Sequence, residues 1–167
     1  MSRVITVVIL AVLVPNAGLA GTATEVKVTT LSTMLTELQG VGEWGYAALV
    51  EVDGKKILFD TGARPGTVLK NVGELGLDLG DVETVVLSHH HWDHTGGLVT
   101  LRKHFRETDL TALKQAHVGE GIFLPRSMDP EAAKRFAKIG PPRELLVNMS
   151  EVRAEFEALG GEFTVHD

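Results

Sequence analysis

Alternating apolar and polar positions in the first third of the chain predict three β-strands. Residues 25–31 alternate in this way, which is typical of a strand with one buried face. Residues 46–52 and 56–59 flank Asp53 and Gly54, a dipeptide that favours a tight hairpin turn because both residue types tolerate positive φ. The pattern therefore predicts an opening strand followed by a hairpin.

A helical pattern follows the hairpin, and a buried strand comes after it. Pro65 opens a helix that Gly76 ends. The apolar residues on one face of this helix are Val68, Leu69, Val72 and Leu75. Residues 83–87 are a short β-branched run that predicts a buried strand, and the Gly-Gly pair at 96–97 leads into a helix that reaches about His104.

The second half of the chain continues this alternation. Residues 113–118 and 162–166 have strand patterns, and residues 129–140 have the Asp-Pro start of a helix that ends near a glycine. Asn148 and Ser150 both offer a cap for another helix. That helix places Val152, Phe156 and Leu159 on one face. Strands and helices in this order predict an α/β protein in which the hairpin adds antiparallel pairing.

The first 20 residues have the composition of an export signal. Arg3 supplies a positive charge, residues 4–14 are an unbroken apolar run, and residues 18–20 place small side chains where a signal peptidase cleaves. The alternative is a membrane anchor, but the run has 11 residues and a spanning helix needs about 20. We predict a signal peptide over residues 1–20, one domain over residues 21–167, a periplasmic or secreted location, and no membrane attachment after cleavage.

Composition narrows the partners and the ligand chemistry. The net charge is -6 and the pI is near 5.6, so the chain lacks the basic excess with which proteins contact nucleic-acid phosphates. We therefore expect a small-molecule substrate and no nucleic acid. The sequence contains no cysteine, which leaves histidine and carboxylate side chains to bind any metal.

A histidine-rich segment begins directly after the strand predicted at residues 83–87. Its spacing, H-x-H-x-D-H, supplies four candidate metal ligands: His89, His91, Asp93 and His94. An extended backbone projects the first two histidines to the same side, and the last two residues lie past a turn where they can face a second ion. Imidazole and carboxylate suit Zn²⁺, and also Fe or Mn. The alternative is a solvated histidine-rich surface, which the Trp-Asp interruption and the position after a strand disfavour.

This motif, preceded by Ile-Leu-Phe-Asp-Thr-Gly at residues 57–62, resembles the metallo-β-lactamase superfamily. Residues 50–62 and 84–98 resemble in particular its dihydropterin-ribofuranosylaminobenzene phosphate synthase-like branch. The resemblance implies an αββα sandwich with its metals at the sheet edge. The chain would form the N-terminal part of that sandwich.

The resemblance also implies roles for individual residues. His89 and His91 would bind one zinc ion, and Asp93 and His94 would bind a second. Asp93 would be the catalytic residue, because it would orient a metal-bound hydroxide and carry its proton to the leaving group. Asp60 would hold the geometry of the site, or it is an ordinary turn residue.

The superfamily needs further ligands from later strands, namely two histidines and a bridging aspartate. The remaining candidates are His104, His117, His166 and Asp167. His104 falls on the helix after the motif, and His117 either borders the site or is structural. We therefore expect the missing ligands to lie beyond residue 167 of a longer parent protein.

Together these features predict a metal-dependent hydrolase that acts on a small-molecule ester, lactam or phosphoester. Two alternatives stay open: a mononuclear iron oxidoreductase on the same fold, and a truncated, non-catalytic metal-binding fragment. Such a fragment would leave apolar sheet surface uncovered, which favours an oligomer that covers it. Residues 42–46, which include Trp44, form either a loop beside the substrate or a hairpin turn, and we favour the turn.

Overall fold

A single mixed β-sheet organises the part of the chain that the structure describes, which is residues 22–36, 39–124, 131, 134 and 148–167 of a computed structural model. Six strands pair in sequence order. They are β1 (Val26–Ser32), β2 (Ala47–Val52), β3 (Lys55–Phe59), β4 (Thr84–Leu87), β5 (Gln115–Gly119) and β6 (Glu162–His166). The first three strands pair antiparallel, and β3 to β6 run parallel.

The predicted hairpin joins β2 to β3. Asp53 and Gly54 have φ angles of 48° and 81°, which is the left-handed conformation that a two-residue hairpin turn requires. The Asp53 carboxylate also accepts hydrogen bonds from the backbone N–H groups of Thr24 and Glu25, at 3.0 and 2.9 Å. This contact ties the chain before β1 to the hairpin turn.

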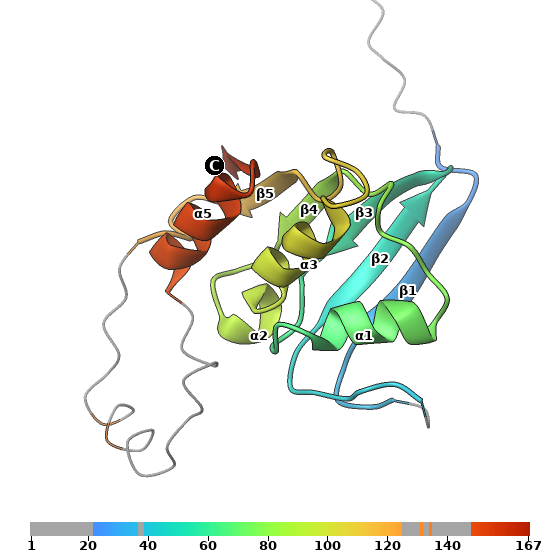
Figure 1. The fold of residues 1–167 in the computed structure, drawn as a ribbon, viewed down its shortest axis with the longest axis horizontal. Coiled ribbons are helices and arrows are strands. Elements are labelled where there is room, and N and C mark those ends of the chain that lie inside the picture. Colours follow the sequence, from blue (N-terminus) through green and yellow to red (C-terminus); the bar gives the residue numbers. More distant parts are fainter. Residues whose placement is uncertain (1–21, 37–38, 125–130, 132–133, 135–147) are drawn as a thin grey trace, which may run out of the picture.

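Helices cover one face of the sheet (Figure 1). They are α1 (Thr67–Glu74), α2 (Trp92–Thr95), α3 (Leu98–Phe105) and α5 (Met149–Ala158). Alternate strand residues such as Leu58, Val85 and Val118 are buried in one cluster with Leu101 of α3 and Phe156 of α5. Burial of these side chains between sheet and helices supplies the main stabilisation of the fold. The predicted α/β class is confirmed.

The opposite face of the sheet carries no helix within the described residues (Figure 1). Val26 and Val28 of β1 point to this face and are 60% and 57% exposed. Their cross-strand partners are Val52 and Val50. The described residues therefore form one sheet with one helical layer, which is the arrangement expected for one half of the predicted sandwich.

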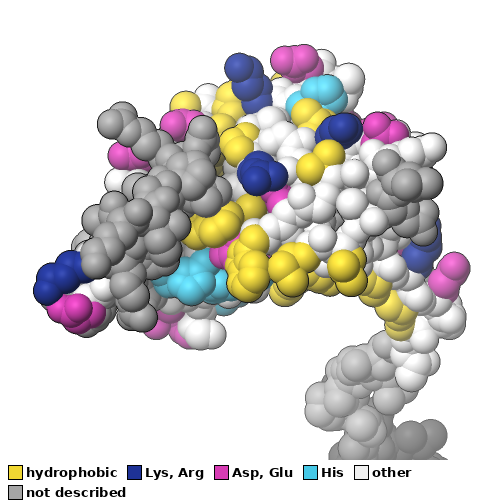
Figure 2. All heavy atoms as spheres, turned by 90° about the horizontal axis from the view of Figure 1, so that it is seen from below, with side chains coloured by type: hydrophobic (Ala, Val, Ile, Leu, Met, Phe, Trp, Pro, Cys, Tyr) yellow, Lys and Arg dark blue, Asp and Glu magenta, His cyan; other side chains and the backbone are white. Residues whose placement is uncertain are grey.

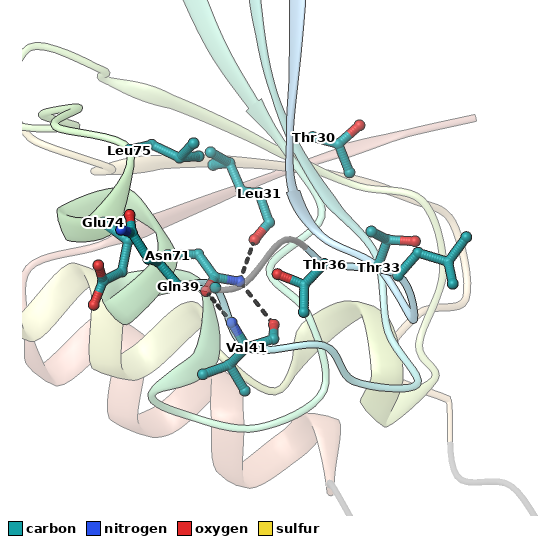
Figure 3. A pocket seen from close by; sticks show the side chains of 11 residues that line it. Thr30, Leu31, Thr33, Thr36, Gln39, Val41, Asn71, Glu74 and Leu75 are labelled. Carbon is teal, nitrogen blue, oxygen red and sulfur yellow. Dashed lines mark hydrogen bonds between the residues drawn. The ribbon is translucent and has the colours of Figure 1, made fainter.

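Helix α1 departs from prediction at its start, while its end before Gly76 is as predicted. It begins at Thr67 rather than at Pro65, and Leu75 follows its last residue. Leu75 was expected in the core, but it is 53% exposed. Its side chain lies at the mouth of a cavity of about 320 Å³ between α1 and the β1–β2 connection (Figure 3). The helix ends at the predicted stop, since Gly76 follows the C-cap Leu75 with a φ of 63°.

Two other predicted boundaries can be compared with the structure. Strand β5 begins at Gln115 rather than at Leu113, because Leu113 has a φ of 52° and donates its N–H to Val82 outside the strand ladder. Helix α5 begins as predicted, with the Asn148 side chain accepting from the Ser150 N–H.

Other predictions concern parts of the chain that the structure leaves out or only partly covers. The signal peptide predicted at residues 1–20 and most of the helix predicted at 129–140 lie outside the described residues. Within the described part, no helix has the length and hydrophobicity to cross a membrane.

Candidate metal centre

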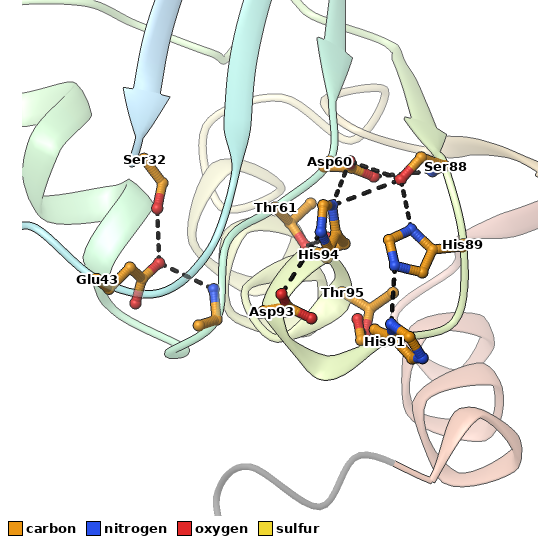
Figure 4. Close-up of polar contacts among 11 residues, drawn as sticks. Ser32, Glu43, Asp60, Thr61, Ser88, His89, His91, Asp93, His94 and Thr95 are labelled. Atoms are coloured by element: carbon orange, nitrogen blue, oxygen red, sulfur yellow. Dashed lines mark hydrogen bonds and ion pairs between the residues drawn. The ribbon is translucent and has the colours of Figure 1, made fainter. Parts of the chain in front are cut away.

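The histidine-rich segment lies where β3 and β4 end side by side (Figure 4). These strands are parallel, and Phe59 pairs with Val86, so the residues that follow them meet at one edge of the sheet. Asp60 follows β3, and Ser88 follows β4. Loops at this edge of an open α/β sheet commonly carry functional residues.

Three of the four predicted ligands converge on one point. Ligand atoms of His89, His91 and Asp93 all lie within 4.8 Å of one another. The His89 Nε2 and His91 Nδ1 atoms are 3.0 Å apart, close to the separation of about 3.3 Å that two nitrogens adopt around a tetrahedral zinc ion. The donor set and its spacing therefore fit a divalent metal, Zn²⁺ among them.

The backbone turns into a helix in the middle of the motif. His91 has the predicted extended conformation, with φ of -67° and ψ of 144°, and it is the N-cap of α2. Asp93 and His94 lie on the single turn of α2, which the His94 N–H closes onto the His91 carbonyl at 3.0 Å. This turn brings Asp93 back toward the two histidines, whereas the sequence predicted it on a separate ion.

His94 lies at the border of the three-residue group. Its Nε2 atom is 3.6 Å from Asp93 Oδ2, and its Nδ1 atom is 2.7 Å from Asp60 Oδ2. An Nδ1–H that donates to Asp60 leaves Nε2 unprotonated on the side of Asp93, which is the form that binds a metal. The four residues of the motif are thus neighbours, and Asp60 orients the ring of His94.

Asp60 is a buried carboxylate, only 1% exposed. Its Oδ1 accepts from the Ser88 N–H at 2.8 Å, and its Oδ2 accepts from the Ser88 hydroxyl at 2.7 Å. Asp60 also has a φ of 54°, a conformation that aspartate adopts more readily than most residues. These contacts place Asp60 behind His94, where the resemblance implied a residue that holds the site.

The surroundings of His89 favour its neutral form. Partial burial of the ring, with His94 and His91 nearby, lowers the pKa of His89, although Asp60 and Asp93 oppose the change. A neutral imidazole is the form that coordinates a metal. The Ser88 hydroxyl lies 2.9 Å from His89 Nδ1, so Nε2 is the nitrogen that faces His91.

The segment that carries Trp44 is not a tight turn. It belongs to the connection between β1 and β2, and the Tyr46 N–H donates to the Asp93 carbonyl at 3.0 Å. Trp44 itself is 66% exposed. The hairpin-turn interpretation of residues 42–46 is therefore wrong, because the chain reverses between the antiparallel strands β1 and β2 over a longer connection, of which residues 42–46 are the part beside the metal motif.

Close backbone packing joins the metal motif to the loop after β3. The Gly96 N–H donates to the Gly62 carbonyl at 2.9 Å, and a Cβ on Gly96 would lie 1.9 Å from the Ala63 carbonyl oxygen. Only glycine fits this position. Sequence reasoning used Gly96 as the start of a helix and missed this contact. It also missed the buried Glu43, since an acidic residue in a glycine-rich loop resembles ordinary solvated surface.

The other histidines lie apart from the motif. His104 is exposed on α3, as predicted. His117 Nδ1 lies 2.8 Å from His166 Nε2, which joins β5 to β6. The two ring centroids are 5.1 Å apart with nearly parallel planes, so the rings meet edge to edge as a hydrogen-bonded pair. Neither histidine belongs to the three-residue ligand group.

A small cavity of about 110 Å³ borders the motif. Its lining residues are Ser88, His89, His90, Gly119, Glu120 and Ile122. The larger cavity of Figure 3 is lined by no residue of the motif. The smaller cavity is the one relevant to the metal centre, because His89 lines it. The larger cavity offers more space but no ligand of the motif.

The sequence of the chain matches the model of the metallo-beta-lactamase superfamily over residues 45–167. With this fold and this ligand motif, the chain belongs to that superfamily. A curated relative from Methanocaldococcus jannaschii, 7,8-dihydropterin-6-methyl-4-(beta-D-ribofuranosyl)-aminobenzene-5'-phosphate synthase, is 38% identical over 63 residues, which cover 35% of this chain and 21% of the relative. The predicted resemblance to the superfamily and to this branch is confirmed.

Two solved structures are similar to parts of this chain. A metal-dependent hydrolase of the beta-lactamase superfamily is 30% identical with a TM-score of 0.40, covering 57% of this chain and 30% of the other. A subclass B3 metallo-beta-lactamase of Bradyrhizobium japonicum is 25% identical with a TM-score of 0.36, covering 47% and 28%. The chain thus spans about a fifth to a third of the length of these three proteins.

Proposed function

We propose that this chain binds divalent metal through His89, His91, Asp93 and His94 and that it serves a metal-dependent hydrolase. The observation that carries the proposal is the convergence of His89 Nε2 and His91 Nδ1, 3.0 Å apart, with the Asp93 carboxylate in the same 4.8 Å group. The expected metal is Zn²⁺, with two ions in the complete site. A zinc ion at such a site activates water at neutral pH and polarises a carbonyl or phosphoryl oxygen.

The residues of the site then have different proposed roles. His89 and His91 hold the metal, and Asp60 keeps His94 in the form that can bind. Asp93 is the proposed catalytic residue, because its carboxylate lies beside the ligands and can orient the attacking water and move its proton to the leaving group. Ser88 is not the nucleophile, since its hydroxyl already donates to Asp60.

The substrate we propose is a small-molecule ester, lactam or phosphoester. The name of one relative supports a phosphate-bearing small molecule, because that relative is the synthase of a phosphate-bearing pterin compound. The net charge of -6 disfavours nucleic acid. Fold alone does not choose among these substrates.

A substrate panel tests the proposal. The metal-free chain is assayed with an aryl ester, a lactone, a chromogenic β-lactam and an aryl phosphodiester, before and after Zn²⁺ is added. We expect zinc-dependent turnover of at least one, with a loss of about 100-fold or more in Asp93→Asn. Turnover that D93N leaves unchanged would contradict the role of Asp93.

Two other outcomes favour the alternative functions. Zinc binding without turnover of any of the four compounds would support a non-catalytic metal-binding fragment. The incomplete coverage of the sheet and the short span relative to known relatives are the observations that keep this candidate open. Iron as the metal in purified protein, determined by elemental analysis, would support a mononuclear iron oxidoreductase.

We also propose that residues 1–20 are removed during export to the periplasm or the medium. Arg3, the apolar run at residues 4–14 and the small residues at 18–20 support this. Mass spectrometry of the exported protein should show an N-terminus at Gly21. Protein that keeps Met1 and stays in the cytoplasm would contradict export.

A further inference from the structure

Glu43 is a buried carboxylate that the proposed chemistry does not use. It is 6% exposed and lies in the connection between β1 and β2 (Figure 4). Its Oε1 accepts from the Ser32 hydroxyl at 2.8 Å and from the Ala63 N–H at 2.9 Å, and its Oε2 accepts from the Arg64 N–H at 2.9 Å. One side chain thus joins the end of β1 to the loop between β3 and α1.

The charge of Glu43 is stabilised by dipoles. Within the described residues, no lysine or arginine forms an ion pair with Glu43. Two consecutive backbone N–H groups and a hydroxyl point at the carboxylate instead, an arrangement that stabilises an anion. The backbone of Gly62 is pressed against it, since a Cβ on Gly62 would lie 2.4 Å from Glu43 Oε1, and Gly62 has a φ of 73°. The carboxylate therefore fits the loop closely.

The loop that Glu43 holds is the loop that holds His94. The Thr61 N–H and the Thr61 hydroxyl both donate to the His94 carbonyl, at 2.7 and 3.0 Å. Asp60, the preceding residue, fixes the His94 ring. Backbone and side chain of His94 are thus both set by residues 60–61, which lie two to four positions before the N–H groups that Glu43 binds.

We infer that Glu43 is a positioning residue for the metal centre. Its carboxylate fixes the loop at residues 60–64 so that Asp60 stays hydrogen-bonded to His94 Nδ1. The inference rests on the proposed function, in which His94 binds metal, but the Asp60–His94 contact can be measured without any metal. Glu43 would then control which ring nitrogen of His94 carries the proton, although it does not contact His94 itself.

The test compares Glu43→Gln with the matched control Glu74→Gln, an exposed glutamate on α1. An amide at position 43 presents its NH₂ group to a backbone N–H, which turns one attraction into a repulsion. The first readout is the proton NMR signal of His94 Nδ1–H in metal-free protein. We expect this signal in the wild type and in E74Q, and we expect it to be lost or shifted upfield in E43Q.

The second readout is zinc affinity by chelator competition. We expect about tenfold to hundredfold weaker binding in E43Q, and unchanged binding in E74Q. A wild-type His94 signal and wild-type zinc affinity in folded E43Q would overturn the inference, even if the unfolding midpoint falls, because Glu43 would then serve stability alone.

A milder variant covers the case in which E43Q does not fold. Ser32→Ala removes one of the three donors to the carboxylate, and it should shift the same His94 signal by a smaller amount. An unshifted signal in S32A would overturn the inference. If the wild type binds no zinc, the proposed function fails, and the NMR comparison still decides the role of Glu43.

Discussion

Asp60 has an unusual backbone conformation, and its side chain orients the proposed ligand His94. It combines a φ of 54° with three hydrogen bonds, two from Ser88 and one from His94. Asparagine tolerates the same φ, but its amide NH₂ would donate to His94 Nδ1 and move the ring proton to Nε2. We therefore expect Asp60→Asn to weaken zinc binding by about tenfold to hundredfold, measured by chelator competition, in a protein that still folds.

Asp53→Asn is the matched control for this change. Asp53 also has a positive φ and also accepts from backbone N–H groups, but it lies in the β2–β3 turn. We expect D53N to keep wild-type zinc affinity. Equal affinities for D60N, D53N and the wild type would contradict the role of Asp60.

Residues that share a short motif could be predicted from the sequence, and residues that meet through the fold could not. His89 and His91 lie two positions apart and converge as expected, and Asp93 joins the same group although it was expected on a second ion. Glu43 binds N–H groups 20 and 21 positions away, and no periodic pattern marks such a contact. The turn of α2 that brings Asp93 to the histidines also depends on neighbours outside the motif.

The strands and helices were predictable because their apolar positions repeat with a regular period, while several of their ends were not. The start of α1 falls at Thr67, two residues past the predicted Pro65, and the start of β5 depends on the left-handed turn at Leu113. The cap of α5 was predicted because an asparagine that accepts from an N–H two residues on acts locally. Caps formed by neighbouring residues can be predicted from the sequence, whereas element ends that depend on tertiary contacts cannot.

Arg102 of α3 shows a tertiary contact at the scale of whole elements. It is 2% exposed and donates to the carbonyls of Ala112 and Leu159, which join α3 to the loop before β5 and to the end of α5. Burial, with Arg106 nearby, lowers its pKa. We expect Arg102→Met to cost about 2–3 kcal/mol in the free energy of unfolding, because those carbonyls stay buried without a donor.

Urea denaturation measures this cost, and Lys103→Met is its control. Lys103 is the next residue on α3 and is exposed, so its replacement should change stability by about 0.5 kcal/mol or less. If R102M and K103M unfold at the same urea concentration, the buried guanidinium does not stabilise the packing of α5 against α3.

At the scale of the whole molecule, the main feature is the sheet face that no described residue covers. Val28 and Val26 are exposed on β1, and Val50 lies beside them on β2. An apolar sheet face in water favours association, so we expect the 167-residue chain to self-associate through this face. In sedimentation velocity, Val28→Glu should shift the protein toward monomer over a tenfold range of concentration.

Leu110→Glu controls for the added charge. Leu110 is 70% exposed and lies in the connection between α3 and β5, away from β1. L110E should associate like the wild type. A monomeric wild type, or equal dissociation by the two variants, would contradict association through the open face.

The central claim is that the residues between 89 and 94 form a metal site at the edge of the sheet. Equilibrium dialysis against Zn²⁺ followed by elemental analysis tests it most directly, with the exposed His104 as control. We expect the wild type and His104→Ala to retain zinc and the double variant H89A/H91A to lose it. Zinc content that is the same in all three proteins, or absent from the wild type, would contradict the account.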